Sequence, residues 1–451
     1  MTDFLGSVWW MIVSLGVLVT FHEFGHFWVA RRNGVRVLRF SVGFGRPLWS
    51  RTGRDGTEYV IAALPLGGYV RMLDEREGEV APDQAHAAFN RKGVWQRIAI
   101  VAAGPLANLL LCVGLLWAMF VIGRPDFQPV LGQVQGIAAE SGLGRGDTLL
   151  AVGDRPTPTW SEASLALAAA AIDRRDVALR LRTAGGQEAT RTLRLSALPE
   201  DVDQRRLVQA IGLVPRAFLL PPLVGRVAED SAAWGVLAEG DRITAVDGSP
   251  VAAFTDIGPL VQALGERGGA GMVEVERDGQ RLALEIAPRQ VEQEGRGRFW
   301  ALGIEPVAGL TAQHDATLRH GPLAALPAAA TETWRLARDT VGMVWRMATG
   351  RASVEHVSGP ITIARYANAS AGMGPAWFLN FLALLSLSLA IINLLPIPIL
   401  DGGHLLYYLI ELVKGSPLSE RAMAAGQYVG LALLAGLMGL AFYNDILQLV
   451  R

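Results

Sequence analysis

The sequence predicts a multi-pass α-helical membrane protein with four transmembrane helices, a β-hairpin loop between the first two and two tandem α+β modules outside the membrane. Three observations predict this fold class. Hydrophobic residues make up 51% of the 451 residues and are concentrated in four long segments. A strand-like pattern separates the first two segments. A related sequence occurs twice between the second and third segments, which indicates a tandem repeat.

Each of the four apolar segments is long enough to cross about 30 Å of hydrocarbon at about 1.5 Å per helical residue. They are residues 4–29, 98–123, 376–400 and 422–442. With their flanks, we assign residues 1–30, 98–123, 373–401 and 422–451 to the four transmembrane segments and the tail. No small-x-small cleavage site follows the first segment, so we expect it to stay in the mature protein rather than act as a signal peptide.

The first apolar segment contains an H-E-x-x-H pattern formed by His22, Glu23 and His26. On a helix, two His residues four positions apart project from one face and can share one zinc ion. Glu23, beside the first of them, can accept a proton from the attacking water. The alternative is a polar helix face satisfied by its neighbours, but polar groups within apolar spans are usually functional. The motif therefore predicts zinc chemistry inside a membrane.

A second constellation ends the third apolar segment and consists of Asn393, Pro396, Pro398 and Asp401. Two prolines this close cannot both lie in a regular helix, so we expect the helix to unwind and its backbone to line a cavity. Asp401 supplies the carboxylate that a catalytic zinc with two His ligands still lacks. Asp401 could instead cap a helix, and His404 could be the ligand. We expect His404 to support the ligands without binding the metal.

The basic residues predict the orientation. Residues 31–97 are rich in Arg, often close to the membrane ends, whereas no Arg or Lys precedes Phe4. We therefore expect residues 31–97 and the predicted loop at 402–421 to be cytoplasmic. Both termini and residues 124–375 are then outside, and the metal site lies near the cytoplasmic side.

The loop between the first two spans has strand-like segments at residues 36–44 and 57–64, with Gly and Asp between them, which predicts a hairpin. A glycine-rich segment follows. Because glycine lets another backbone come close, a substrate could add there as an extra strand. An ordinary cytoplasmic hairpin is the alternative. The candidate substrate-binding residues are Gly67, Gly68, Tyr69 and Val70 in this segment, together with Asn393, Pro396 and Pro398 where the third apolar segment is expected to unwind.

Two related modules are predicted at residues 124–218 and 219–310. Each begins with a short strand, continues to a Gly-Asp turn, at Gly146-Asp147 and Gly240-Asp241, and then carries one helix-like stretch. The stretches are residues 161–172 and 256–264, as expected of compact α+β units. The linker, residues 311–372, contains an amphipathic stretch at 331–348 with Trp334 and Trp345 on its apolar side. Frequent charges favour a helix on the membrane surface rather than a span.

The overall composition gives no sign of a nucleic-acid partner and rules out an intrachain disulfide. A formal net charge of −1 gives no reason to expect nucleic acid as a partner. Cys112 is the only cysteine, so an intrachain disulfide is impossible.

The two polar constellations together resemble the site-2 protease family of intramembrane metalloproteases. The resemblance extends to Gly104-Pro105-Leu106-Ala107-Asn108, to Gly67-Gly68-Tyr69-Val70 and to Ser358-Gly359-Pro360-Ile361, in the same order. It implies one Zn²⁺ per chain, held by His22, His26 and Asp401, with Glu23 as general base. Asn108 either supports the site or packs helices together. The resemblance also implies that the β-hairpin loop is membrane-associated. The two modules resemble bacterial PDZ domains.

This resemblance implies regulated intramembrane proteolysis in the bacterial inner membrane. The expected substrate is a transmembrane anti-sigma factor-like protein of the envelope stress response, already trimmed outside by a site-1 protease, or a remnant signal peptide. A metal transporter with a broken helix and a non-catalytic PDZ scaffold are the alternatives. The modules would act as a size filter, or would bind a newly exposed carboxyl terminus in a groove at residues 224–227.

Overall fold

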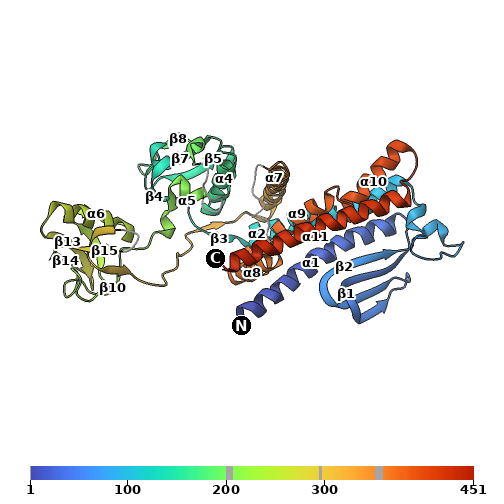
Figure 1. Cartoon of the computed structure of the whole chain (residues 1–451), viewed down its shortest axis with the longest axis horizontal. Helices are drawn as coiled ribbons and strands as arrows, with labels where there is room; N and C mark the ends of the chain where they lie inside the picture. Colours follow the sequence, from blue (N-terminus) through green and yellow to red (C-terminus); the bar gives the residue numbers. More distant parts are fainter. Residues whose placement is uncertain (1, 200–206, 294–296, 351–358, 451) are drawn as a thin grey trace. The chain divides into compact units, whose positions relative to one another are not determined.

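The computed structural model describes residues 2–199, 207–293, 297–350 and 359–450, so Ser358 lies outside the described residues. The chain divides into two compact units. The first combines Met1–Arg124 with Arg319–Arg451 and contains the long helices, and the second is Pro125–Leu318 (Figure 1).

Four helices of the first unit are long and apolar enough to cross a membrane. They are α1 (Thr2–Arg32), α2 (Val94–Ile122), α9 (Pro375–Leu394) and α11 (Glu420–Val450). The third helix is shorter than we expected, because Leu395, which precedes Pro396, adopts an extended conformation with ψ 143°. A proline disfavours helical geometry in the residue before it, and so α9 ends at Leu394.

The segment predicted as a cytoplasmic loop at 402–421 is mostly helical. Helix α10 (Asp401–Lys414) begins directly after the loop that follows α9 and is followed by Gly415, which has φ 78°. A glycine in the left-handed conformation is a common helix end. The apolar run of α10, residues 405–410, is too short to cross a membrane, and Leu406, Leu409 and Val413 are exposed, so the segment was not recognised as a helix.

The predicted hairpin is confirmed. Strands β1 (Val37–Thr52) and β2 (Glu58–Met72) form an antiparallel pair. Both strands bend, so that Phe40 of β1 pairs with Tyr59 on one side and with Val70 on the other. The end of β2, residues 68–72, is consequently an edge of this sheet. The sheet lies beside the carboxyl-terminal half of α1 (Figure 1), where Phe27 packs against the rings of Phe40 and Tyr59.

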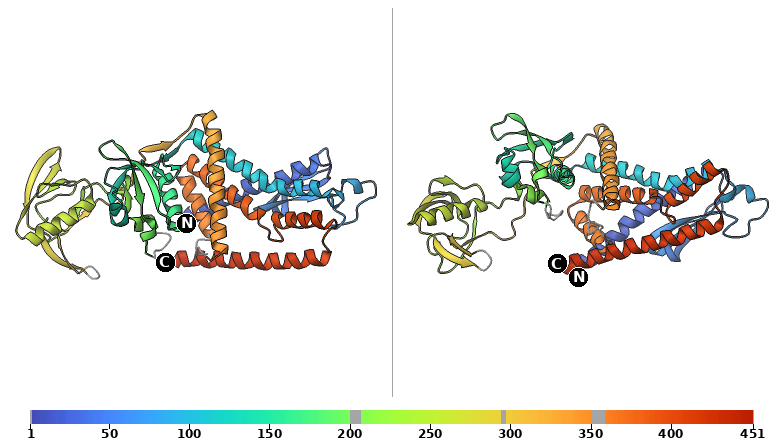
Figure 2. Two further views of the ribbon diagram at one scale, coloured as in Figure 1. Left: turned by 90° about the horizontal axis from the view of Figure 1, so that it is seen from above. Right: turned by 45° about the horizontal axis from the view of Figure 1, so that its top comes forward.

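The predicted linker contains two helices, α7 (Pro322–Ala348) and α8 (Pro360–Gly372). The amphipathic helix therefore starts at Pro322 and not at residue 331, because an alanine-rich segment with proline at its first position continues it towards the amino terminus. Helix α7 runs across the direction of α2 and α11 (Figure 2). Its Trp334 and Trp345 side chains are exposed, while Thr333 contacts Cys112 of α2.

The second unit contains two modules with the same strand arrangement, which confirms the internal repeat. In the first, a sheet of order β6-β5-β7-β8 and the pair β4-β9 surround α4; in the second, β12-β11-β13-β14 and β10-β17 surround α6. The first module comprises β4 (Leu131–Val134), β5 (Thr148–Val152), β6 (Arg155–Pro156), α4 (Trp160–Ile172), β7 (Val177–Arg182), β8 (Glu188–Leu193) and β9 (Leu213–Pro215), with short helices α3 (Gly136–Glu140) and α5 (Leu207–Ile211). The second comprises β10 (Val224–Val227), β11 (Arg242–Val246), β12 (Ser249–Pro250), α6 (Phe254–Arg267), β13 (Gly271–Arg277), β14 (Gln280–Ile286) and β17 (Ile304–Pro306), with an added hairpin of β15 (Arg289–Gln293) and β16 (Gly297–Ala301). Strands β3 (Arg124–Asp126) and β18 (Ala316–Leu318) pair with each other.

The repeated Gly-Asp turn has a structural role in both modules. Asp147 accepts hydrogen bonds from the backbone N–H groups of Gly144 and Ala184, at 2.8 and 3.1 Å. Asp241 accepts one from Ala238 at 2.9 Å and two from the Arg277 guanidinium at 2.7 Å each. Both carboxylates are buried, and each ties the turn to the module around it.

Residues 224–227, where we predicted a groove, form β10, which pairs with β17 along one edge. These residues do not line the cavity of the second module. A cavity of about 910 Å³ lies instead between α6 and the segment that leads into β17. The first module repeats this segment, because Ile211-Gly212-Leu213-Val214-Pro215 matches Leu302-Gly303-Ile304-Glu305-Pro306 in position and in strand register. This repeated segment was the feature of the sequence that could have indicated the position of the groove.

Candidate metal centre

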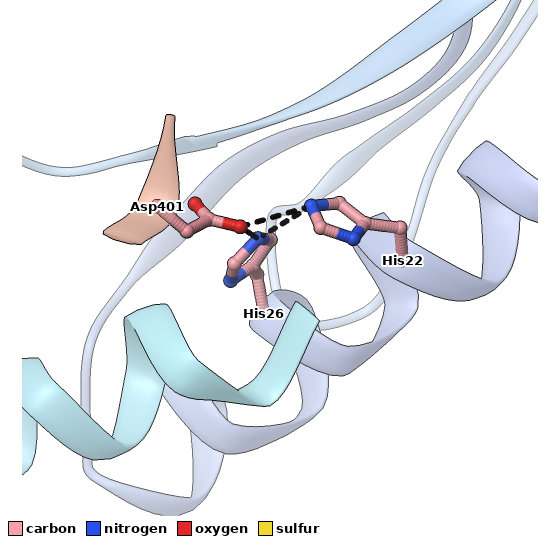
Figure 3. Close-up of side chains that lie close together, drawn as sticks. All are labelled: His22, His26 and Asp401. Carbon is pink, nitrogen blue, oxygen red and sulfur yellow. Dashed lines mark hydrogen bonds and ion pairs between the residues drawn. The ribbon is translucent and has the colours of Figure 1, made fainter. Parts of the chain in front are cut away.

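Three side chains from two helices converge within the first unit. His22 and His26 lie one turn apart on α1 and point to the same side, where the Asp401 carboxylate meets them (Figure 3). The Nε2 atoms of His22 and His26 are 3.1 and 3.5 Å from Asp401 Oδ2 and 3.2 Å from each other. A tetrahedral zinc ion with donors at about 2.0–2.2 Å requires donor atoms roughly 3.3–3.6 Å apart. The triangle therefore has the size that zinc needs.

Helix α2 makes room for the two His side chains. A Cβ atom on Gly104 would lie 2.2 Å from His26 Nε2 and 2.9 Å from His22 Cε1, so a side chain here would collide with both rings. The close approach is reciprocal, since a Cβ on Gly25 of α1 would lie 2.2 Å from the Ala103 carbonyl oxygen. Small residues at these two points allow α1 and α2 to come close together.

Groups on α2 also orient the imidazole rings. His26 Nδ1 lies 2.9 Å from the Ile100 carbonyl oxygen, which can only accept, so Nδ1 carries the proton and Nε2 is free to bind a metal. The amide of Asn108 lies 3.3 Å from His22 Nδ1. Among the described residues, nothing hydrogen-bonds Asn108 Oδ1, which is fully buried. With the amide turned by 180°, this oxygen would accept the His22 Nδ1 proton and leave Nε2 free there too.

The loop after α9 delivers Asp401 to this position. Ile399 has φ 114°, which is unusual for a β-branched residue, and its neighbour Leu400 is extended. The following helix starts tightly against the loop. A Cβ on Gly402 would lie 2.2 Å from the Leu395 carbonyl oxygen, and one on Gly403 would lie 2.5 Å from that of Ile397. The Asp-Gly-Gly sequence therefore lets α10 begin directly on the loop backbone.

Glu23 lies at a cavity of about 280 Å³ that also touches His26 and Asp401. Val70, on the edge of β2, lines the same cavity, and its backbone N–H faces the Glu23 carboxylate. Gly68 is also near this side chain, since a Cβ placed on it would lie 3.4 Å from Glu23 Cγ. The structure thus brings the glycine-rich edge of the hairpin next to the predicted general base.

The far wall of the cavity is charged. Asp74 and Arg76 line it together with His404 and Tyr408. Burial alone would raise the pKa of the Asp74 carboxyl group, but hydrogen bonds from Arg76 outweigh it and hold that pKa below its usual value. His404 lies one turn after Asp401, within this wall and outside the group of three converging donors.

The remaining predicted substrate residues lie away from the three donors. Asn393 belongs to the last turn of α9, and Pro396 is exposed in the loop after it. Pro398 packs against α11, where its carbonyl oxygen touches the position of Gly430. Sequence reasoning missed the contributions of Gly25, Ile100 and the Asp74–Arg76 pair. Gly104 was visible within a motif, although its contact with the two His residues was not.

The donor set fits a zinc ion. Two imidazole nitrogens and one carboxylate oxygen are a common catalytic zinc set and leave a fourth position open. Within the described part of the chain, no hydrogen bond of good geometry reaches the buried Asp401 Oδ2, and His22, His26 and Asp401 are the group of His, Cys, Asp and Glu residues able to hold a metal ion. A buried carboxylate oxygen without such a bond is costly unless a cation compensates it.

Comparison with known proteins identifies relatives over the whole chain. A putative zinc metalloprotease of Xylella fastidiosa (strain 9a5c) is 55% identical over 447 residues, which cover 99% of this chain and all of the relative. The regulator of sigma-E protease RseP of Escherichia coli (strain K12) is 42% identical over the full length of both chains, and that of Salmonella typhimurium (strain 14028s / SGSC 2262) is 42% identical over 97% of this chain and 98% of its own. Residues 10–437 match the family model described as peptidase family M50. The chain therefore belongs to peptidase family M50.

Proposed function

We propose that this membrane zinc metalloprotease performs regulated intramembrane proteolysis and cuts the transmembrane segments of single-span proteins. The observation that carries the proposal is the convergence of His22, His26 and Asp401 beside Glu23, between helices long and apolar enough to cross a membrane. The names of the relatives, zinc metalloprotease and regulator of sigma-E protease, support it. Neither a metal transporter nor a silent scaffold is favoured by them.

In this proposal one zinc ion is held by His22 Nε2, His26 Nε2 and Asp401 Oδ2. When bound, zinc lowers the pKa of water and polarises a peptide carbonyl group. Glu23 accepts the proton of the attacking water and returns it to the leaving nitrogen. Asn108 and the Ile100 carbonyl fix the proton on Nδ1 of each imidazole, and His404 lines the cavity beside the ligands.

The substrate would be presented as an extended strand along residues 67–70. A helical peptide bond is shielded and already hydrogen-bonded, so a transmembrane helix must unwind before it is cut. An unwound segment paired with the edge of β2 would run beside Glu23, because Val70 and Gly68 both lie against that side chain. Asn393, Pro396 and Pro398 would contact the substrate from the opposite side, where α9 unwinds.

The proposed setting is the bacterial inner membrane, with the metal site near the cytoplasmic side and both termini in the periplasm. The second unit is then periplasmic and consists of two PDZ-like modules. The substrate is an anti-sigma factor-like membrane protein, which an upstream site-1 protease trims first. The modules exclude substrates with a bulky external domain. The alternative is that the groove between α6 and β17 binds the new carboxyl terminus, which its large cavity supports.

The test is metal-dependent cleavage of a model single-span substrate by the purified protein. Removal of metal with a chelator should abolish cleavage, and added zinc should restore it, because the three donors are otherwise intact. Asp401→Asn should weaken zinc binding, since an amide is a poorer ligand than a carboxylate. Full cleavage after complete metal removal would refute the mechanism. Zinc bound to Asp401→Asn with wild-type affinity would make His404 the better third ligand.

A further inference from the structure

One face of α2 contacts both of the helices that carry the metal site, α1 and α10. Arg97, Ile100, Gly104 and Asn108 are spaced at i, i+3, i+7 and i+11 and therefore share a face of the helix. Ile100 accepts a hydrogen bond from His26, Gly104 faces both imidazole rings, and Asn108 contacts His22. These three contacts position α1. Arg97, the first of the four residues on this face, contacts α10 instead.

Arg97 forms a two-pronged ion pair with Glu411 of α10. Its Nη2 and Nη1 atoms donate to Glu411 Oε1 and Oε2 at 2.7 and 3.2 Å, and both side chains are only 12% exposed. The guanidinium also lies 4.8 Å from the centre of the Tyr408 ring, one turn earlier on α10. Planar double hydrogen bonding and a cation–π contact both fix orientation as well as distance.

The placement of these charges is unfavourable for each helix alone. Arg97 lies in the first turn of α2 and Glu411 in the last turn of α10. A helix dipole favours the opposite signs at both places. The ion pair therefore stabilises the packing of α2 against α10 and does not stabilise either helix by itself. It joins the helix that carries Asp401 to the helix that positions His22 and His26.

We propose that the Arg97–Glu411 pair is a positioning contact that holds Asp401 where it can share a zinc ion with the two His ligands. The inference rests on the proposed zinc site. Asp401 is the first residue of α10 and follows a strained loop. A contact later in α10 is therefore needed to fix the direction of the helix. Glu411, about 15 Å along the helix axis, provides that second point of attachment.

Zinc affinity of the full-length protein, measured by competition with a chelating indicator, tests the inference. Glu411→Gln keeps the shape of the side chain, and Arg97→Ala removes the partner, so each should weaken zinc binding by about 10–100-fold, the range for groups that support metal ligands. Cleavage should recover at excess zinc, because all ligands and Glu23 remain. The double variant Arg97→Glu with Glu411→Arg should restore the affinity. Arg97→Lys keeps the charge without the planar fork and should lie in between.

The matched control is Glu162→Gln, which breaks the similarly buried Arg155–Glu162 pair in the second unit and should leave zinc affinity unchanged. Folded Glu411→Gln and Arg97→Ala proteins with wild-type affinity would overturn the inference. A folded charge-swap variant that binds zinc as weakly as the single variants would also overturn the inference. If the single variants do not fold, the zinc affinities of the charge-swap variant and of Arg97→Lys test the inference in their place. A wild-type protein that binds no zinc, or His26→Ala that binds it unchanged, would refute the proposed function instead.

Discussion

At the scale of single residues, the metal site depends on a position without a side chain. Gly104 lies in the middle of a membrane helix, where glycine costs about 1 kcal/mol relative to alanine. That cost is accepted here because a Cβ would come within 2.2 Å of His26 Nε2. The site therefore needs the absence of a methyl group as much as it needs its ligands.

Replacement of Gly104 by alanine should weaken zinc binding by about 10–100-fold, the range for disturbed neighbours of metal ligands, because the methyl group displaces an imidazole ring. The matched control is Gly114→Ala in the same helix, where nothing lies within 4 Å of the new Cβ. The zinc affinities of both purified variants, compared with wild type, test this prediction. Equal affinities would mean that the rings do not pack on Gly104.

The four residues of the proposed metal chemistry could be predicted from the sequence because their side-chain types and spacing are those that such chemistry requires. His22, Glu23 and His26 have a fixed spacing on one helix, and Asp401 follows a pair of prolines. The groups that orient them could not be recognised in the same way. The Ile100 carbonyl is a backbone group that any residue could supply, and only the packing of α1 on α2 places it beside His26.

At the scale of elements, the edge of β2 determines how a substrate would meet Glu23. Val70→Pro removes the backbone N–H that faces Glu23, which is also the group that would donate to an added strand. Loss of the Glu23 contact alone should slow all substrates equally. If the edge also holds the substrate, helical substrates should lose more than those with Gly or Pro near the scissile bond, which unwind at lower cost.

Cleavage rates for the two substrate classes, compared between Val70→Pro and wild type, measure this difference. Zinc content serves as the control and should be unchanged. Equal losses for both classes would exclude strand addition at this edge and leave Val70 only its contact with Glu23.

The buried Asp241–Arg277 pair gives the second module a dependence on pH. Burial tends to raise the pKa of Asp241, but hydrogen bonds from Arg277 and the Ala238 backbone bring it below the usual value. A carboxyl group with a lowered pKa in the folded state stabilises that state above its unfolded pKa of about 3.9, and this contribution is lost as the pH falls through the folded value.

Asp241→Asn should therefore lower the local stability of the second module at pH 7 by about 1–3 kcal/mol, the cost of leaving buried partners unsatisfied. The difference from wild type should shrink as the pH drops below 4. Hydrogen exchange of β11 and β13 in the full chain measures it, with exposed Asp278→Asn as the control. A difference that does not change with pH would contradict this account.

The sequence predicted helices correctly where the hydrophobic residues form a long segment. It did not predict them where apolar and polar residues are mixed. The four long apolar segments each contain a helix long and apolar enough to cross a membrane, although His22, Glu23 and His26 interrupt the first. Helix α10 buries Gly402, Gly403 and Tyr408, and the start of α7 buries Ala325 and Ala329, so hydrophobicity alone did not indicate them. The groove of the second module was misplaced because the pairing of β10 with β17 is a long-range property.

At the scale of the whole molecule, the second unit is separate from the metal site, since all three donors belong to the first. Deletion of residues 128–306 should therefore leave zinc binding intact. As a size filter, the unit predicts that the deletion allows untrimmed substrates to be cut, while trimmed substrates are cut at a similar rate. Recognition of a new carboxyl terminus predicts instead that the deletion abolishes cleavage of trimmed substrates.

A smaller change separates the same two hypotheses without deletion. Gly258 lines the groove, and no atom lies within 4 Å of a Cβ placed there, so Gly258→Trp should fill the groove without disturbing the fold. Glu266→Trp, exposed on the same helix, is the control. Unchanged cleavage of trimmed substrate by Gly258→Trp supports the filter, whereas its selective loss would favour binding of the carboxyl terminus.

The central claim is that Glu23 transfers the proton at a zinc site formed by His22, His26 and Asp401. Its most direct test measures zinc content and cleavage of a trimmed single-span substrate in one preparation of Glu23→Gln, beside wild type. Glutamine keeps the shape but cannot take up the proton, so zinc should remain at wild-type stoichiometry while cleavage falls at least about 100-fold. Cleavage at the wild-type rate with zinc bound would contradict the claim.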